Sequence, residues 1–172
     1  MKRVLLFVAP VVVFALVNNV GCGFSKLSDD RPAQAMFTPQ SIRVHPVFTK
    51  VSHWTGTPAP DGLDVFVELQ DGFGDHTKAA GVFVFDLFDY DPRSPDMRGK
   101  RVQQPWLTPV ETVQQQRDHY DRTSRAYRFQ LIAPEIRLDK SYVLSAQFNP
   151  TGGLPRVFGQ LVIQQGAGGS KQ

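Results

Sequence analysis

Residues 138–148 read LDKSYVLSAQF, and this stretch carries the strongest indication of the fold. From Tyr142 onward, apolar side chains alternate with Val143, Ser145 and Gln147. A period of two residues is typical of a β-strand with one face toward a core. The segment therefore predicts a strand that begins at a tyrosine, directly after a short polar turn.

Six further segments predict strands, with turn residues between them: 42–48, 63–70, 80–90, 101–107, 127–131 and 157–163. Residues 63–70 alternate strictly, which predicts a strand buried on one face. Residues 80–90, AGVFVFDLFDY, are apolar on both faces and predict a central strand covered on both sides. Pro46 indicates that the first strand lies at a sheet edge. About seven short strands favour a mainly β chain with a single antiparallel β-sandwich over residues 41–165.

One short helix is expected among the strands. Thr108-Pro109-Val110-Glu111 has threonine at the cap, proline at the first helical position and glutamate at the third. This is a capping-box arrangement, so we expect a helix near residues 109–119.

The stretch Leu138–Leu144 resembles the penultimate strand of immunoglobulin and fibronectin type III folds. In those folds, a tyrosine at the strand start bonds back to the preceding corner. The resemblance implies an Ig-like sandwich with Tyr142 in that role, and the alternative is a plain core tyrosine. Because the chain has one cysteine, the resemblance is to members of the fold without the antibody disulfide.

The N-terminus has the pattern of a targeting segment. Lys2 and Arg3 precede an apolar stretch from Val4 to Val17, and Gly21 is a small residue before Cys22. A basic start, an apolar stretch and a small residue at the cut are typical of a secretory signal peptide, here residues 1–21. The stretch is too short to cross a bilayer comfortably, and the alternative is a buried first helix.

Residues 20–23 resemble the processing site of a bacterial lipoprotein. Gly21 and Cys22 match that family's site, whereas Asn19 replaces its usual leucine. The resemblance implies that the Cys22 thiol carries a diacylglyceryl group, which would anchor the chain to a membrane of the cell envelope. Gly23, in place of aspartate, implies the outer membrane. The alternative is ordinary secretion with a free thiol.

The regions on either side of the sandwich have a different composition. Residues 22–40 predict a lipidated cysteine followed by a flexible tether, and residues 166–172 predict a disordered tail. Three segments also resemble uncharacterised lipoproteins of planctomycete-type bacteria: Asp61–Val65, Asp89–Pro92 and Tyr127–Phe129. That group brings no established activity with it, so the resemblance bears on location alone.

The charge is segregated along the chain. The 19 basic and 16 acidic side chains give +3, and removal of Lys2 and Arg3 with the signal peptide leaves 17 against 16, or +1. Residues 61–96 hold nine carboxylates and two cations, a net of −7, whereas residues 98–128 hold seven cations and three carboxylates, a net of +4. We expect pairing between acidic and basic strands.

The basic segment also has the residue types of a nucleic-acid site. It interleaves arginines with tyrosines: Arg117, Arg122, Arg125, Arg128, Tyr120 and Tyr127. Asp118 and Asp121 dilute the positive charge, and an export signal separates the chain from nucleic acid. We therefore expect a solvated face paired with the acidic strands, and no nucleic-acid partner.

An acidic turn offers an alternative function. Asp89, Asp91 and Asp96 resemble the calcium loop of C2 domains, which would make the chain a calcium-responsive binding module. C2 domains add aspartates from an earlier loop, and Asp71 and Asp75 are the candidates. The ten-residue strand between the two loops places them about 30 Å apart. A solvated turn explains the same residues.

The remaining motifs do not indicate a catalytic function. His45, His53, His76 and His119 lie in different segments, and the sequence has neither a nucleophile elbow nor an HExxH motif. We expect no catalytic residue, cofactor or bound metal. The predicted role is a non-enzymatic binding or structural module, with an envelope protein or polysaccharide as partner. The loops Asp71–Ala79 and Asn149–Pro155 should share one end of the sandwich, with Phe73 exposed there.

Overall fold

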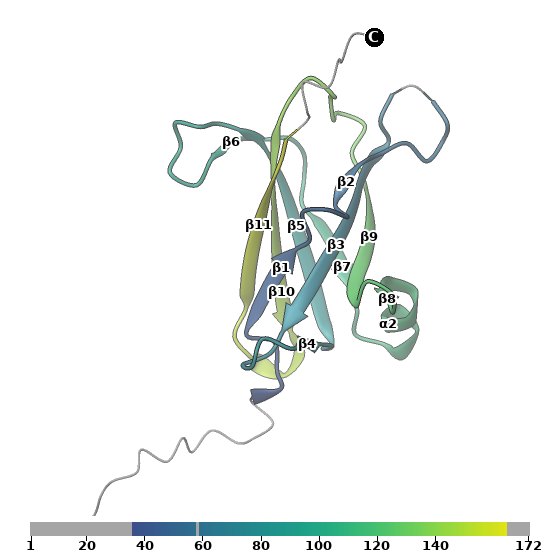
Figure 1. The fold of residues 1–172 in the computed structure, drawn as a ribbon, viewed down its shortest axis with the longest axis vertical. Coiled ribbons are helices and arrows are strands. Elements are labelled where there is room, and N and C mark those ends of the chain that lie inside the picture. The colour runs from purple at the N-terminus through teal and green to yellow at the C-terminus, as the bar shows by residue number, and fades with distance from the viewer. Residues whose placement is uncertain (1–35, 58, 165–172) are drawn as a thin grey trace, which may run out of the picture. The chain divides into compact units, whose positions relative to one another are not determined.

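The computed structural model describes residues 36–57 and 59–164, which form two antiparallel β-sheets (Figure 1). The predicted signal peptide, Cys22, most of the predicted tether and the C-terminal tail lie outside the described residues. In the described part of the chain, no helix has the length and apolar character that a membrane crossing requires.

The first sheet has six strands. Its main order is β1 (Ser41–Val44), β3 (Gly62–Gln70), β9 (Ala126–Ile132) and β8 (Tyr120–Asp121). The short strands β2 (Lys50–Ser52) and β4 (His76–Thr77) also pair with β3. The edge position of β1 confirms the prediction made from Pro46, and the strand ends before that proline.

The second sheet has five strands. Its main order is β11 (Val157–Ile163), β10 (Tyr142–Pro150), β5 (Gly81–Tyr90) and β6 (Arg98–Arg101), and β7 (Trp106–Pro109) pairs with β5 as well. The predicted strand at 101–107 is thus two strands. Strands β1, β3 and β9 in one sheet and β5, β10 and β11 in the other reproduce the A-B-E and C-F-G arrangement of immunoglobulin domains. The prediction of a mainly β chain with two antiparallel sheets and one short helix is confirmed, and this arrangement is consistent with a β-sandwich.

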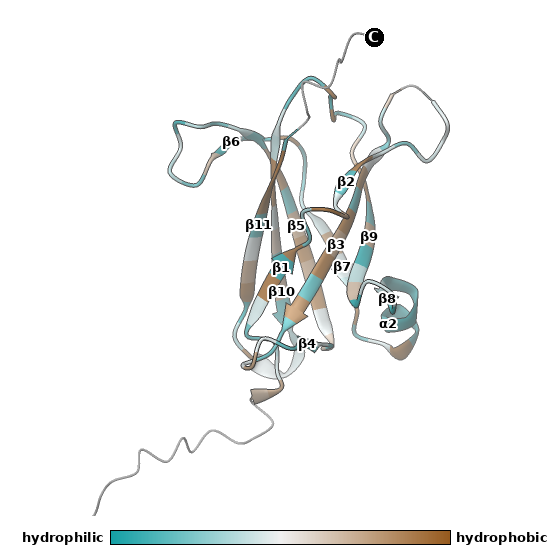
Figure 2. Ribbon diagram, viewed as in Figure 1, coloured by the Kyte–Doolittle hydropathy of each residue, from teal (hydrophilic) through white to brown (hydrophobic). Residues whose placement is uncertain are grey.

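The core between the sheets is aromatic. Phe83 on β5 lies at its centre, with ring centroids 5.1 Å from Tyr127, 5.0 Å from Phe129 and 4.5 Å from Phe148. These rings come from both sheets, and all four are almost completely buried. Figure 2 shows the alternation of apolar and polar residues along the strands that supply this core.

Tyr142 makes the predicted corner bond. Its side chain is buried, and its hydroxyl accepts a hydrogen bond of 2.8 Å from the backbone N–H of Arg137. The bond ties the start of β10 to the turn that precedes it, so the corner role is confirmed over that of a plain core tyrosine.

The helix begins later than predicted. It is α2 (Val113–His119), and its capping box uses Thr112 and Gln115 instead of Thr108 and Glu111. The first candidate box fails because β7 continues through Pro109 in pairing with β5, and the N–H of Val110 then donates to Gly81 O at 2.8 Å. Tertiary pairing overrides the local helix signal, and a second box one turn later starts the helix.

The two central strands differ from prediction in their outer faces. On β3 the outer residues Asp64 and Glu68 are buried, so this strand is covered on both faces instead of one. On β5 buried and half-buried residues alternate up to Leu87, and residues 88–90 are half-buried, so the outer face is only partly covered. Neighbouring side chains cover β3, since Asp64 accepts hydrogen bonds from Ser52, Trp54 and Arg128.

Candidate functional site

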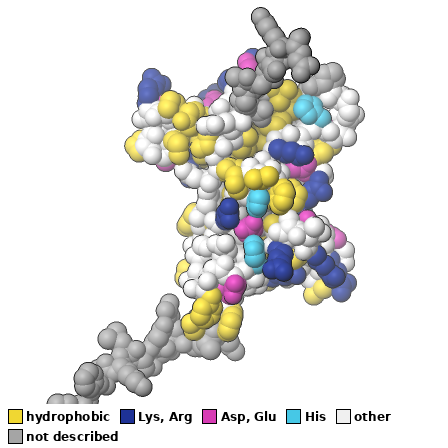
Figure 3. All heavy atoms as spheres, viewed as in Figure 1, with side chains coloured by type: hydrophobic (Ala, Val, Ile, Leu, Met, Phe, Trp, Pro, Cys, Tyr) yellow, Lys and Arg dark blue, Asp and Glu magenta, His cyan; other side chains and the backbone are white. Residues whose placement is uncertain are grey.

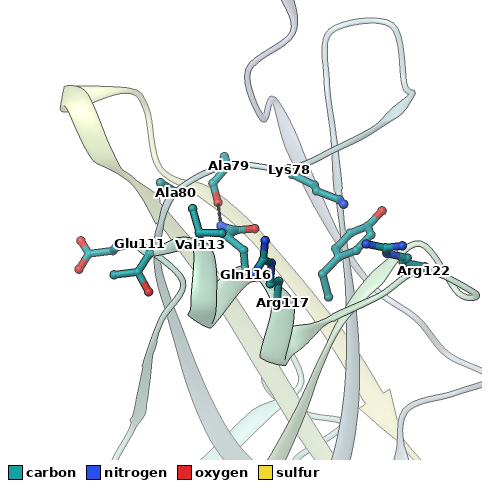
Figure 4. A pocket seen from close by; sticks show the side chains of 10 residues that line it. Lys78, Ala79, Ala80, Glu111, Val113, Gln116, Arg117 and Arg122 are labelled. Atoms are coloured by element: carbon teal, nitrogen blue, oxygen red, sulfur yellow. Dashed lines mark hydrogen bonds between the residues drawn. The ribbon is translucent and has the colours of Figure 1, made fainter.

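A groove lies between the β4–β5 loop and α2 (Figure 4). Its first hollow, of about 480 Å³, is lined by Lys78, Glu111, Arg117, Tyr120 and Arg122 among others. A second hollow, of about 550 Å³, adds Asp75, His76 and Arg125 and shares Lys78, Tyr120 and Arg122 with the first. Because three residues line both hollows, we treat the two as one basic groove.

Gln116 fixes the wall of the basic groove. Its side-chain amide donates to the backbone oxygens of Ala79, at 2.8 Å, and Val110, at 2.6 Å. Its side-chain oxygen accepts a 2.7 Å bond from the Tyr127 hydroxyl, and burial raises the pKa of that tyrosine. These bonds join α2 to the β4–β5 loop and to the core, so the two walls are held together.

Lys78 and Tyr120 line both hollows and contact each other. The Lys78 Nζ lies 3.6 Å from the centroid of the Tyr120 ring, a cation–π contact. The Tyr120 ring packs edge-on against the buried Tyr127, with centroids 5.3 Å apart. A tyrosine hydroxyl is protonated at neutral pH and can donate a hydrogen bond, and burial raises the pKa of Tyr120 further.

The turn after β8 carries Arg122 and Arg125. Asp121 accepts bonds from the backbone N–H of Thr123, at 2.9 Å, and from the Ser124 hydroxyl, at 2.9 Å. These bonds hold the pKa of Asp121 below its usual value. Arg125 has a φ of 55°, a left-handed conformation that such a turn requires. The turn is therefore ordered by its own contacts.

The cations of the basic groove differ from the arginines on the strands, all of which take part in ion pairs. Within the described residues, four cations of the groove take part in no ion pair: Lys78, Arg117, Arg122 and Arg125. By contrast, Arg128 on β9 pairs with Asp64 on β3, and Arg101 on β6 pairs with Asp86 on β5, each at 3.1 Å. Figure 3 shows Lys and Arg side chains exposed on this face of the domain.

Pairing between acidic and basic strands is therefore confirmed in part. It accounts for the arginines on the strands, whereas the cations of α2 and the following turn lack acidic partners in the described structure. Of the six residues with nucleic-acid character, Arg117, Tyr120, Arg122 and Arg125 line the basic groove. Arg128 lies in an ion pair, and Tyr127 lies in the core.

Lys78 belongs to the groove but not to the predicted set. It lies about forty residues before the arginines and reaches them only because β4 and β5 bring their connecting loop beside α2. No spacing in the sequence indicates this contact. Gln116 is likewise missed, since a glutamine on a short helix has no distinctive pattern.

The acidic turn shows no calcium-binding arrangement. Asp91 accepts from the N–H of Arg93 and pairs with its guanidinium at 3.1 Å, and Asp96 accepts a 2.6 Å bond from the Ser94 hydroxyl. Asp89 lies 3.7 Å from Lys140. Among the described residues, no three His, Cys, Asp or Glu side chains are grouped to hold a metal. These contacts do not test the calcium hypothesis for Asp89, Asp91 and Asp96, which stays a prediction.

The end loops are placed as expected. Pro150 pairs with Gly81 and the N–H of Thr151 donates to Ala80 O, so the β10–β11 loop lies beside the start of β5. The loop Asp71–Ala79 leads into the same strand start, whereas the acidic turn follows its far end. Phe73 is exposed, with its ring centroid 6.0 Å from that of Phe37.

Comparisons with protein-family models, with curated proteins and with solved structures each give no match to this chain.

Proposed function

We propose that this protein is an exported, lipid-anchored module of the cell envelope that binds another envelope component without catalysing a reaction. The N-terminal pattern up to Cys22 supports export and anchoring. The sandwich supports binding because it is a rigid scaffold whose loops and short helix build a surface groove.

The observation that carries the binding role is the set of unpaired cations in the basic groove. The mature chain is nearly neutral, with 17 basic and 16 acidic side chains, so partners for these cations are available in the sequence. Strand arginines use them, as Arg128 does with Asp64. These four cations form no ion pair within the described fold. Their position around a hollow with fixed walls therefore favours a role in binding a partner.

The anchor is tested with the Cys22→Ser variant. Cells that express the wild type and the variant are labelled with a radioactive fatty acid and separated into membrane and soluble fractions. We expect label and membrane association for the wild type and neither for Cys22→Ser. Ser25→Ala, a control in the same tether, should behave as the wild type. Absence of label in the wild type would show that the chain is not lipidated.

The binding role is tested by capture from envelope extracts. The wild type is compared with two double variants. The groove variant is Lys78→Gln/Arg122→Gln, and the control variant is Lys50→Gln/Lys100→Gln. Each double variant loses two positive charges. Lys50 and Lys100 are exposed on β2 and β6 and line neither hollow of the basic groove. We expect the wild type and the control to retain the same component and the groove variant to lose it. Equal retention by all three would contradict a binding role for the groove.

A further inference from the structure

We infer that the basic groove binds an acidic polysaccharide, with its cations on the carboxylate or sulfate groups of successive sugars. This inference rests on the binding role proposed above and names the class of ligand. It depends on how the cations are distributed along the groove and on the carboxylates that lie beside them.

The cations are spread along the basic groove instead of converging on one point. Arg117 lines only the first hollow, Arg125 lines only the second, and Lys78 and Arg122 line both. A single phosphate or carboxylate would be held by donors that meet at one position. Cations in two adjoining hollows match a ligand that carries repeated negative groups along its length.

Each hollow also contains a carboxylate. Glu111 lines the first and Asp75 lines the second, and neither takes part in an ion pair within the described residues. A carboxylate repels a ligand that offers only negative groups, as a run of acidic residues in a peptide does. It accepts hydrogen bonds from hydroxyl groups. Acidic sugars present negative groups and hydroxyls on the same ring, and so match both kinds of side chain.

The groove provides neutral hydroxyl partners in the same place. The Tyr120 hydroxyl is protonated at neutral pH, as in any tyrosine, and the Tyr120 ring contacts Lys78 and Tyr127. Thr112, at the helix cap, also lines the first hollow. Because the walls are fixed by Gln116 and the turn by Asp121, little ordering is needed when a ligand binds.

The test is calorimetric titration of the full chain, purified in a non-ionic detergent, with polygalacturonate as the probe. Neutral dextran is the uncharged control polymer. We expect polygalacturonate to bind at low ionic strength, with an affinity that falls as salt rises, and dextran not to bind. Absence of polygalacturonate binding, or equal binding of dextran, would overturn the inference.

Charge-matched variants locate the site. Lys78→Gln/Arg122→Gln should weaken polygalacturonate binding about tenfold, and Lys50→Gln/Lys100→Gln, with the same loss of charge, should weaken it about twofold or less. Thermal unfolding confirms that each variant is folded. Equal weakening by the two pairs would show that net charge alone drives binding, which would overturn the inference.

Two further probes separate the possible sources of negative charge. Polyglutamate tests an acidic peptide, and phosphatidylglycerol vesicles test an anionic membrane surface. We expect both to bind more weakly than polygalacturonate, and Asp75→Asn/Glu111→Gln to improve polyglutamate binding without improving that of polygalacturonate. Tighter binding of either probe than of polygalacturonate would overturn the polysaccharide assignment. The capture experiment with envelope extracts would still test the proposed binding role of the groove, because its outcome does not depend on the class of ligand.

Discussion

Arg122 and Arg128 are six residues apart, and they lie in regions of the molecule that use positive charge differently. Arg128 on β9 bonds to the buried carboxylate of Asp64 and lies over the Phe66 ring, 5.7 Å from its centroid. Arg122 lines the basic groove and has no ion pair within the described residues. The paired arginine joins two strands, whereas the unpaired one is free to contact a ligand.

This contrast separates stability from binding. Removal of one charge from a strand pair takes the charged hydrogen bond away from its buried partner, which destabilises the fold. Removal of an exposed, unpaired cation leaves no orphan group, so the fold is nearly unaffected. If the assignment of the two regions is right, substitutions on the strands change the free energy of unfolding, and substitutions in the basic groove change affinity.

The largest stability effect is expected on the strand side. Asp64→Asn removes the charged acceptor of Arg128 and weakens the bonds from Ser52 and Trp54. We expect the free energy of unfolding to fall by about 1 to 3 kcal/mol, measured by urea unfolding. Asp86→Asn on β5 is the matched control, since Asp86 pairs with Arg101 at a more exposed position. A loss at Asp86 as large as that at Asp64 would contradict the distinction.

The same pair gives a pH dependence. Burial alone raises the pKa of Asp64, but hydrogen bonds from Ser52 and Arg128 outweigh it and hold the pKa below its usual value. A lowered folded-state pKa contributes stability above the unfolded value of about 3.9, and this contribution is lost as the pH falls through the folded pKa. The stability gap between wild type and Asp64→Asn should therefore narrow below about pH 4, measured by unfolding at several pH values. A gap that is constant with pH would show that Asp64 is not stabilised by its charge.

A smaller effect is expected where the groove meets the core. Tyr127→Phe removes the hydroxyl that bonds to Gln116 and leaves the ring in the core. We expect a loss of about 1 kcal/mol in urea unfolding, together with faster hydrogen exchange at α2, because the helix loses a tie to the sheet. Tyr120→Phe, which removes a hydroxyl nearby, is the control and should leave exchange at α2 unchanged.

The smallest stability effect is expected in the basic groove. Lys78→Gln/Arg122→Gln should change the free energy of unfolding by less than about 0.5 kcal/mol, because neither residue takes part in an ion pair within the described structure. Urea unfolding of this variant and of Asp64→Asn measures both changes in the free energy of unfolding. A loss as large as that of Asp64→Asn would mean that the groove cations serve the fold.

The acidic turn supplies a further comparison. Its carboxylates are bonded to Arg93, Ser94 and Arg98 in the folded chain, and these bonds lower the pKa values of Asp91 and Asp96. We expect no heat and no shift in melting temperature on titration with Ca²⁺. A measurable heat that disappears in Asp91→Asn would establish the calcium-responsive alternative.

The sequence predicts the sandwich well because alternation and turn residues are local signals. It locates the strands and the Tyr142 corner, whose bond to Arg137 spans only five residues. It misplaces the helix start, where pairing of β7 with β5 overrides a capping box at Thr108. It underestimates the burial of β3, because hydrogen-bonded carboxylates such as Asp64 can be buried when neighbouring side chains cover them, and it overestimates the burial of β5, whose outer face is half-buried.

The candidate site was predicted only in part. The alternation of arginine with tyrosine indicates that the residues between Arg117 and Arg125 are unusual. It does not indicate which arginines of the basic segment form ion pairs. Pairing depends on strand register, which places Arg128 beside Phe66 and within reach of Asp64. The contribution of Lys78 depends on the path of a loop from a distant part of the chain.

Chemical-shift mapping decides whether the basic groove is the ligand-binding surface of the domain. The backbone amide shifts of the ¹⁵N-labelled chain are followed as polygalacturonate is added. If the polymer binds in the basic groove, the largest changes will cluster at Lys78, Gln116 and Arg122. Changes that are spread over the domain, or that cluster at the acidic turn around Asp91 instead, would contradict binding in the groove.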